Sequence, residues 1–430
     1  MPNICLDDLS PYARDLAEQS LSWAEPMWDP ERALIWSGHS DYDGHSPLTA
    51  HQSDIYKQAQ FYSSWMAVGF LLRNTESDTE KAIRTIHAII DTQLDEPGMP
   101  YHGTFYRWKG DAHPSGLNAV MWKDYDPNWR QFVGLGFATI LEEYEHRLPN
   151  DLIARMDRSL ELAVTGEAPD RCPPTYSNIA LMKTAMAIWV GKRIGNQDLV
   201  DYGEEFGSEV HRLFCENDAF AEYNSPTYYG VNLYALGFWR RYLSDSSVHW
   251  MGRDLEHGLW RDIARYYHFG LRNLCGPFTR SYGMDLTRYT ALVSLHIWLA
   301  YGRDKTPFPT GDEINHEFIY GPCFAIYDSD PPDDVTSAFS SFSGPKKIER
   351  PISTDPKRVA TAVIENDYML GAEASGDFAA HSYQFHAVTA HWRCPDGQIG
   401  WLRLKHIGTT NARAEEDQIT LTTTICSDFK

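Results

Sequence analysis

The sequence has little of what marks a secreted disulfide protein, a nucleic-acid-binding protein or a membrane protein. Its seven cysteines are scattered without a CxxC pair, so we expect reduced thiols. Lysine and arginine number 38 against 59 aspartates and glutamates, and the formal charge of −21 excludes an extended phosphate-binding face, so we expect no nucleic-acid partner. No stretch approaches the roughly 18–20 apolar residues of a membrane span. The first residues lack the basic and apolar regions of a secretory signal, so we expect a cytoplasmic protein.

Motifs for metal, nucleotide and serine-hydrolase chemistry are missing as well. The sequence has no HExxH motif, EF-hand loop, P-loop, GxGxxG or GxSxG pattern. His381, His386 and His391 recur every five residues, but on a strand this spacing alternates between the two faces. The loop from His39 to His45 carries two aspartates, and we interpret it as a solvated loop rather than a cation site. We therefore predict no metal and no cofactor.

Residues 1–303 have the pattern of successive amphipathic helices. In the stretch 51–73, apolar residues recur at intervals of three and four, as on one face of a helix. Strongly apolar helices such as 175–194 alternate with charged ones such as 197–215, and we find no fixed repeat of the kind that an open solenoid shows. The sequence therefore predicts an (α/α) toroid of about ten to twelve helices. The expected helices are 9–24, 51–73, 78–95, 128–147, 149–165, 175–194, 197–215, 228–244, 253–274 and 284–302.

Residues 304–430 differ in character, and we predict that they form a small antiparallel β domain. They follow a breaker-rich linker, 302–311, and are rich in Val, Ile, Thr and aromatic residues. Pro395 to Gly397 has the composition of a hairpin turn. The expected strands are 316–328, 357–371, 381–393, 398–406 and 417–426, with a long exposed loop at 337–358. The predicted fold class is therefore α+β, mostly α.

Four clusters of polar and aromatic residues lie between the expected helices, at 99–108, 122–130, 222–230 and 280–288. Each has a purely structural explanation, since turns, helix caps and surface ion pairs use the same residue types. Tyr228 and Tyr229 would point about 100° apart on a helix, so only one of them readily faces the centre of the ring. Four such clusters are more than helix capping requires, and we interpret them as parts of one site.

The clusters and the order of the two domains resemble the heparinase II/III and alginate-lyase group of polysaccharide lyases. That group joins an (α/α) toroid to an antiparallel β domain. Its sites hold the substrate carboxylate with Asn or Arg and use Tyr and His as acid and base. The resemblance implies these roles for Asn128 and Asn224 as the amides, Tyr229 and Tyr282 as the phenols, His102 as the imidazole and Arg280 as the guanidinium.

The chemistry of these side chains supports the same reaction. Removing a proton next to a carboxylate creates an enolate-like charge, which an amide or guanidinium stabilises. A nearby arginine such as Arg280 would lower the pKa of Tyr282 and make its phenolate a competent base. We therefore predict a metal-free acid–base lyase that breaks a C–O bond in a uronic-acid saccharide or a small metabolite. Further expected substrate contacts are Trp129, Arg130, Tyr176, Asn178, Tyr223 and Arg288.

Other functions remain open at this point. The linalool dehydratase-isomerase family also has an (α/α) barrel, and this similarity implies a dehydratase, isomerase or cyclase that uses the segment from Cys172 to Asn178. A glycoside hydrolase would need two carboxylates facing one cleft. A non-catalytic carbohydrate-binding protein would use Tyr and Trp only for stacking. All these functions take a small-molecule or oligosaccharide partner, and the sequence leaves open a homo-oligomer.

Overall fold

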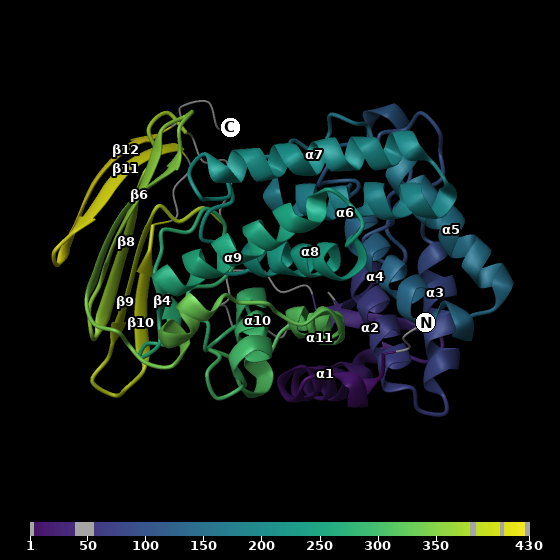
Figure 1. Ribbon diagram of the computed structural model, residues 1–430, viewed down its shortest axis with the longest axis horizontal. Coiled ribbons are helices and arrows are strands. Elements are labelled where there is room, and N and C mark those ends of the chain that lie inside the picture. Colours follow the sequence, from purple (N-terminus) through teal and green to yellow (C-terminus); the bar gives the residue numbers. More distant parts are fainter. Residues whose placement is uncertain (1–3, 39–55, 379–383, 405–407, 426–430) are drawn as a thin grey trace.

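The computed structural model describes residues 4–38, 56–378, 384–404 and 408–425. Helices make up most of the chain before residue 340, and a sheet stands at one end of the helical part (Figure 1). The loop from His39 to His45 and residue His381 lie outside the described residues. The α-helices are α1 (Pro11–Ala24), α2 (Gln60–Arg73), α3 (Asp78–Ile90), α4 (Trp129–Tyr144), α5 (Asn150–Thr165), α6 (Ser177–Ile194), α7 (Gln197–Cys215), α8 (Tyr228–Tyr242), α9 (Val248–Tyr266), α10 (Leu292–Tyr301) and α11 (Gly321–Tyr327).

The helices form two concentric layers that close into a ring. In the inner layer α2 contacts α4, α4 contacts α6, and α6 contacts α8; α11 then contacts both α8 and α2 and closes the circle. Helices α3, α5, α7 and α9 pack outside their neighbours, and α1 packs against α10 and α11. The structure therefore confirms the predicted (α/α) toroid followed by a C-terminal antiparallel sheet.

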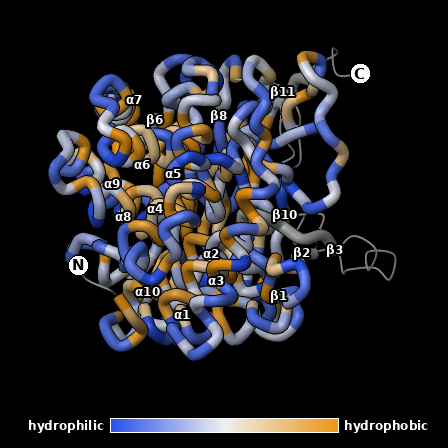
Figure 2. The backbone as a smooth tube through the Cα atoms, turned by 90° about the vertical axis from the view of Figure 1, so that its right-hand side faces the viewer, coloured by the Kyte–Doolittle hydropathy of each residue, from blue (hydrophilic) through white to orange (hydrophobic). Residues whose placement is uncertain are grey.

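The two layers differ in how their helices are buried. In α6 every residue from Ser177 to Gly191 is buried, so this helix is covered on all sides. In α7 the buried residues recur at intervals of three and four and form one face. Figure 2 shows the same arrangement along the backbone, with hydrophobic segments gathered inside and hydrophilic ones outside. The alternation of apolar and charged helices in the sequence thus corresponds to the inner and outer layers.

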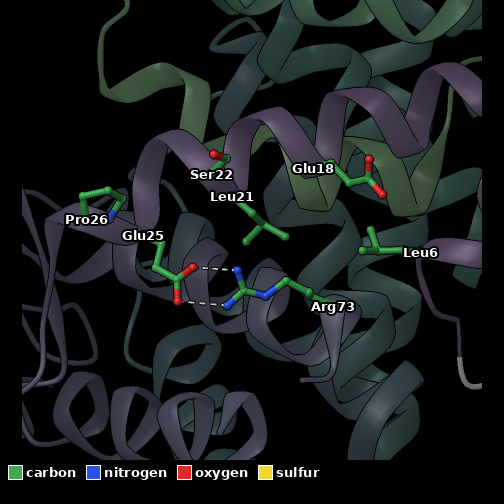
Figure 3. Close-up of a pocket in the computed structure, with 7 residues that line it drawn as sticks. All are labelled: Leu6, Glu18, Leu21, Ser22, Glu25, Pro26 and Arg73. Carbon is green, nitrogen blue, oxygen red and sulfur yellow. Dashed lines mark hydrogen bonds and ion pairs between the residues drawn. The ribbon is translucent and has the colours of Figure 1, made fainter. Parts of the chain in front are cut away.

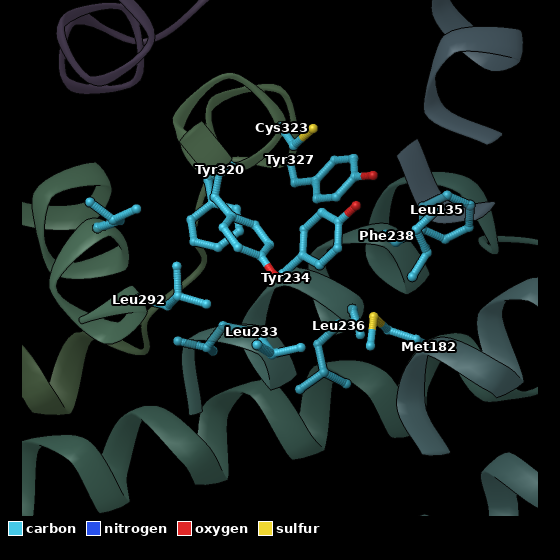
Figure 4. Packing of buried hydrophobic residues seen from close by; sticks show 14 of the residues in the cluster. Leu135, Met182, Leu233, Tyr234, Leu236, Phe238, Leu292, Tyr320, Cys323 and Tyr327 are labelled. Carbon is cyan, nitrogen blue, oxygen red and sulfur yellow. The ribbon is translucent and has the colours of Figure 1, made fainter. Parts of the chain in front are cut away.

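Aromatic side chains fill the middle of the ring (Figure 4). The ring of Tyr234 stacks on that of Tyr327 with centroids 5.3 Å apart, and it meets the edge of Tyr320 at 5.8 Å. All three residues are at least 96% buried. The toroid is therefore closed at its centre, and a ligand can enter it only as far as Tyr320.

The C-terminal part is a seven-stranded antiparallel sheet in which β8 pairs with β7, β9 and β11. The predicted hairpin at Pro395 to Gly397 is confirmed, because Arg393 pairs with Ile399. The strands of this sheet are β6 (Lys346–Ser353), β7 (Arg358–Ile364), β8 (Tyr368–Ala374), β9 (Val388–Arg393), β10 (Ile399–Arg403), β11 (Gly408–Glu415) and β12 (Gln418–Ile425). Shorter strands elsewhere are β1 (Trp28–Asp29), β2 (Leu34–Gly38), β3 (Tyr56–Ala59), β4 (Tyr267–His268) and β5 (Asn273–Leu274).

Some expected elements differ from the structure. The predicted strand 316–328 is wrong: these residues form the 3-10 helix η7 (His316–Tyr320) and α11, because they complete the inner helical layer. The predicted loop 337–358 contains the edge strand β6, whose many charged residues and Pro351 concealed it. The expected helices 253–274 and 284–302 are shorter in the structure, as α9 and α10. The division of the chain at residue 303 stays a prediction.

Candidate active site

A cavity of about 270 Å³ lies at the N-terminal ends of the inner helices. Aromatic and polar side chains from most of these helices meet there. The aromatic side chains are Tyr62, Trp122, Trp129, Phe132 and Tyr320. The polar side chains are Asp126, Asn128, Tyr176, Asn178, Thr227, Tyr228, Arg280, Tyr282 and Glu317. The cavity therefore combines residues that are almost 260 positions apart in the sequence.

The direction of the inner helices explains why the cavity is at this end. The cavity wall contains residues from the first turns of four helices, or from positions directly before these turns. The four helices are α4, α6, α8 and α10. The first turns of a helix carry unpaired N–H groups and the positive end of the helix dipole. The cavity mouth is therefore a favourable place for a negatively charged group, although the whole chain is acidic.

Arg280 connects the polar groups on one wall of this cavity. Its Nη2 donates to the Tyr228 hydroxyl at 2.6 Å, and its Nη1 donates to Glu222 Oε1 at 2.7 Å. Its Nε donates to Gln384 Oε1 at 2.8 Å. The hydroxyls of Tyr228 and Tyr282 are 2.5 Å apart, so Tyr282 is linked to the guanidinium through Tyr228. The guanidinium carbon also lies 3.9 Å from the centre of the Tyr228 ring.

The sheet and the start of α8 hold the segment that carries Arg280 and Tyr282. The Asn224 amide donates to the carbonyl oxygens of Cys275 and Pro277 at 2.7 and 2.9 Å. His391 Nε2 lies 2.8 Å from the carbonyl oxygen of Met284. Burial lowers the pKa of His391, so its ring is neutral near pH 7 and donates from Nε2. The C-terminal sheet thus supports the segment that carries Arg280 and Tyr282.

Burial raises the pKa of each phenol on this wall. It raises the pKa of Tyr228 well above 10 and that of Tyr176 to about 12, although Arg280 acts in the opposite direction on both. The pKa of Tyr282 is raised for the same reason. The charge of Arg280 does act to lower the Tyr282 pKa, as expected, but desolvation outweighs it, so the expected phenolate does not form. With raised pKa values, Tyr228 and Tyr282 keep their hydroxyl protons near pH 7 and can donate them.

Two carboxyl groups face the same cavity, and burial raises the pKa of both. The pKa of Glu317 is raised to about 8 and that of Asp126 to about 6. Glu317 is 7% exposed, and its Oε2 has no hydrogen-bond partner among the described residues. The charges of both carboxyls also act to raise the pKa of Tyr282, which lines the same cavity. Glu317 is therefore a buried, unpaired acid–base group next to a phenol.

Two further polar atoms in the wall have no partner among the described residues, Asn178 Oδ1 and Thr227 Oγ1. The Asn178 side-chain nitrogen donates to Glu222 Oε2 at 2.5 Å, which fixes the orientation of the amide. By contrast, both ends of the Asn128 amide are engaged, with Tyr176 at 2.9 Å and Arg171 at 2.7 Å. Asn178 and Thr227 are thus free to contact a ligand, whereas Asn128 serves mainly to position Tyr176.

Half of the residues singled out in the sequence meet in the cavity. These are Asn128, Trp129, Tyr176, Asn178, Arg280 and Tyr282. The other half do not line it: His102, Arg130, Tyr223, Asn224, Tyr229 and Arg288.

Each of the residues outside the cavity has another environment. The Tyr229 hydroxyl donates to Asp262 at 2.6 Å, and that of Tyr223 donates to Tyr266 at 2.8 Å. Arg288 is exposed and pairs with Glu313. His102 Nδ1 lies 3.7 Å from Asp95 Oδ1. Arg130 is buried, with its Nε donating to the Pro127 carbonyl oxygen at 2.9 Å, and burial lowers its pKa to about 10.

Sequence reasoning missed Glu317, Asp126, Tyr228, Thr227 and Glu222 as site residues. Four of them lie inside the clusters recognised in the sequence, namely Tyr228, Thr227, Glu222 and Asp126. What distinguishes them is their burial and, for Tyr228 and Glu222, hydrogen bonds to distant residues, and both depend on the tertiary structure. The sequence did not indicate Glu317, because the composition of residues 316–328 predicts a strand rather than part of the helical ring.

One hollow elsewhere on the described surface is less suited to chemistry. It lies between α1 and the end of α2 and is shown in Figure 3, where Arg73 pairs with Glu25 at 2.7 and 3.0 Å. Arg73 also pairs with Asp78. Because these charges satisfy one another, the hollow offers a ligand no free charged group.

The family described as Domain of unknown function (DUF8769) matches residues 14–329. The chain belongs to this family. The matched range covers the helical ring through α11 and includes the cavity residues from Tyr62 to Tyr320. No curated protein matches the sequence.

Solved structures resemble the chain weakly. The chondroitin AC lyase of Streptomyces coelicolor A3, in complex with chondroitin sulphate, is 12% identical with a TM-score of 0.45, over 92% of this chain and 54% of that one. Heparinase III is 10% identical with a TM-score of 0.43, over 91% and 58%. This family member thus spans little more than half the length of either structure. Both likenesses are too weak to transfer an activity or a site residue. None of the described helices is long and apolar enough to span a membrane.

Proposed function

We propose that this protein is a carbon–oxygen lyase that uses acid–base catalysis by its own side chains. The observation that carries the proposal is the meeting of an unpaired Glu317 carboxyl and the hydrogen-bonded Tyr282 and Tyr228 phenols in one cavity. An elimination needs a base for the C–H bond and an acid for the leaving oxygen. In this proposal Glu317 is the base and Tyr282 is the acid.

The reaction follows from the protonation states. The ionised Glu317 carboxylate takes the proton from the carbon next to the substrate carboxylate. The electrons of that C–H bond form the C=C double bond while the C–O bond breaks, and the leaving oxygen takes the proton of Tyr282. The Tyr228 hydroxyl, held by Arg280, donates to the resulting phenolate. Proton exchange with solvent then returns Glu317 and Tyr282 to their starting states.

The cavity supports a substrate with a carboxylate. The inner-helix N-termini and the remaining N–H groups of Arg280 would hold this negative charge and stabilise the enolate-like charge that develops on it in the transition state. At about 270 Å³ the cavity is at the low end for ligand pockets, which favours one sugar ring or a small metabolite in the reacting position. We therefore propose a uronic-acid saccharide or a small carboxylated metabolite as substrate.

The test is turnover of uronic-acid oligosaccharides, followed by the ultraviolet absorbance of the conjugated alkene product. We expect Tyr282→Phe and Glu317→Gln each to lower kcat at least 100-fold, since acid–base groups typically contribute 10²–10⁴-fold. The rate should rise with pH, with a midpoint near the Glu317 pKa of about 8. The matched control is Glu313→Gln, which removes a half-buried carboxyl, paired with Arg288 outside the cavity, on the neighbouring 3-10 helix. Full activity in both cavity variants would overturn the proposal.

A glycoside hydrolase is the second candidate, because Asp126 and Glu317 line the same cavity with raised pKa values. In that case Glu317 would be the general acid and Asp126 the base or nucleophile. The same assay separates the two reactions, since a hydrolase releases reducing ends without alkene absorbance. The dehydratase alternative gains no support from Cys172, which does not line the cavity and whose thiol has a pKa that burial raises to about 12, although Tyr176 and Asn178 of the same segment do line it.

A further inference from the structure

Three potential metal ligands meet on the outer layer of the ring, on helices that do not border the cavity. His211 and Cys215 are on α7, and Asp254 is on α9. Their ligand atoms all lie within 4.8 Å of one another. His211 Nε2 is 2.8 Å from Asp254 Oδ2 and 3.5 Å from Cys215 Sγ. A nitrogen, an oxygen and a sulfur ligand thus surround one point.

Secondary structure determines this arrangement. His211 and Cys215 are four residues apart on one helix, so their side chains share a face. Helices α7 and α9 are in direct contact, which brings Asp254 opposite that face. The Trp250 ring meets the His211 ring edge to face at 5.1 Å and limits how the imidazole can turn.

The charge around this point favours a cation. The carboxylates of Asp254 and Asp218 both lie near enough to the Cys215 thiol for their negative charges to act on it. Among the described residues, the only ion-pair partner of Asp254 is His211, and Asp218 has none. The two carboxylates therefore add negative charge around the three ligand atoms.

We propose that His211, Cys215 and Asp254 bind a zinc-like divalent transition-metal ion, with water in the fourth position. Zn²⁺ takes imidazole, thiolate and carboxylate ligands in a tetrahedron with bonds of about 2.0–2.3 Å. Ligand atoms at the corners of such a tetrahedron are roughly 3.3–3.7 Å apart. The present separations need only small shifts. The thiolate selects such an ion over Mg²⁺ or Ca²⁺. On binding, the thiol releases its proton and the ion replaces the His211–Asp254 hydrogen bond.

The ion would join α7 to α9. Because a metal that binds only the folded state adds its binding free energy to folding, the site would stabilise the outer layer. No sequence motif marks this site, because its third ligand, Asp254, comes from a different helix. The three ligands meet only in the folded structure.

The test is titration of the full chain, first treated with a chelator, with Co²⁺. We expect one Co²⁺ per chain and a thiolate-to-cobalt absorption band in the near ultraviolet, which added Zn²⁺ abolishes. Cys215→Ser should remove the band, and Asp254→Asn should weaken binding at least tenfold. The matched control, Cys394→Ser, changes a half-buried cysteine on the β domain and should leave binding unchanged.

A second readout is the melting temperature, which saturating Zn²⁺ should raise in the wild type and in Cys394→Ser but not in Cys215→Ser. Circular dichroism of each variant checks that it is folded. Absence of the band in the wild type, or its persistence in Cys215→Ser, would overturn the proposal. Neither result depends on the lyase assay, so this proposal and the proposed function can fail separately.

Discussion

Tyr228 and Tyr229 are neighbours in the sequence, but their hydroxyls contact different parts of the molecule. A helix turns by about 100° per residue, so Tyr228 faces the cavity and Tyr229 faces α9. Tyr228 touches Arg280 and Tyr282, whereas Tyr229 donates to the buried Asp262. The sequence predicted that only one of the two faces inward and assigned the role of the phenol to Tyr229, whereas in the structure Tyr228 is the one that lines the cavity.

Phenylalanine substitutions at these two positions should separate activity from stability. Tyr228→Phe should lower kcat at least tenfold, because the Tyr282 phenolate loses its donor. Tyr229→Phe should leave kcat of the folded protein within about twofold but lower the free energy of unfolding by ~1–3 kcal/mol, because Asp262 loses a buried hydrogen bond. Steady-state kinetics and urea unfolding measure the two effects. The opposite pattern would move the site to the Asp262 side of α8.

Glu317 should make the stability of the protein depend on pH. Its pKa is about 8 in the folded state against 4.5 for a free glutamate, so the folded state holds a proton that the unfolded chain has released. This favours the folded state fully below pH 4.5, and the advantage is lost as the pH rises from 4.5 to about 8, at roughly 1.4 kcal/mol per pH unit at most. Glu317→Gln should flatten this dependence. Urea unfolding at pH 5, 7 and 9 measures it, and an unchanged slope in the variant contradicts the prediction.

At the scale of elements, the sheet matters to the site because it packs closely on the segment before Arg280. Strand β8 passes this segment at Gly371, where a Cβ atom would overlap the carbonyl oxygen of Gly276. The neighbouring strand contributes His391, which lies against Met284. The separation of the sequence into helical and β-rich parts was readily predicted, but this contact between them was not.

Gly371→Ala should therefore disturb the site from outside the cavity. The new methyl group must push the Gly276 backbone away, which should cost ~1–3 kcal/mol of stability and shift Arg280 relative to Tyr228. We expect kcat to fall more than tenfold with a smaller change in KM. Ala374→Gly, on the same strand, is the control and should reduce stability by less than about 1 kcal/mol with kcat unchanged. Equal kcat values for the two variants would mean that the sheet does not position Arg280.

At the scale of the whole molecule, the negative net charge repels the proposed anionic substrate as it approaches. The local positive groups at the cavity act in the opposite direction. The formal charge of −21 acts over the Debye length, which falls from about 30 Å at 0.01 M salt to about 8 Å at 0.15 M. The helix N-termini and Arg280 act only within a few ångströms. The net charge of the chain therefore governs how the substrate approaches, whereas the helix N-termini and Arg280 govern how it binds.

For a uronic-acid substrate, kcat/KM should rise severalfold between 0.01 and 0.15 M salt, because screening weakens the long-range repulsion. The methyl ester of the same substrate carries no charge and should show no such rise. Initial rates at low substrate concentration measure kcat/KM directly. A fall with salt for the acid would show that local positive charge controls the approach instead.

The sequence alone determined the helical ring, the C-terminal sheet and the hairpin at Pro395 to Gly397. Periodicity, caps and turn residues act over a few neighbours, so these elements can be inferred locally. Tertiary structure decided that residues 316–327 are helical, because closing the ring outweighed their strand-like composition. It also decided which of the candidate side chains meet, since burial, hydrogen bonds and the pKa of Glu317 depend on groups that are far apart in the chain.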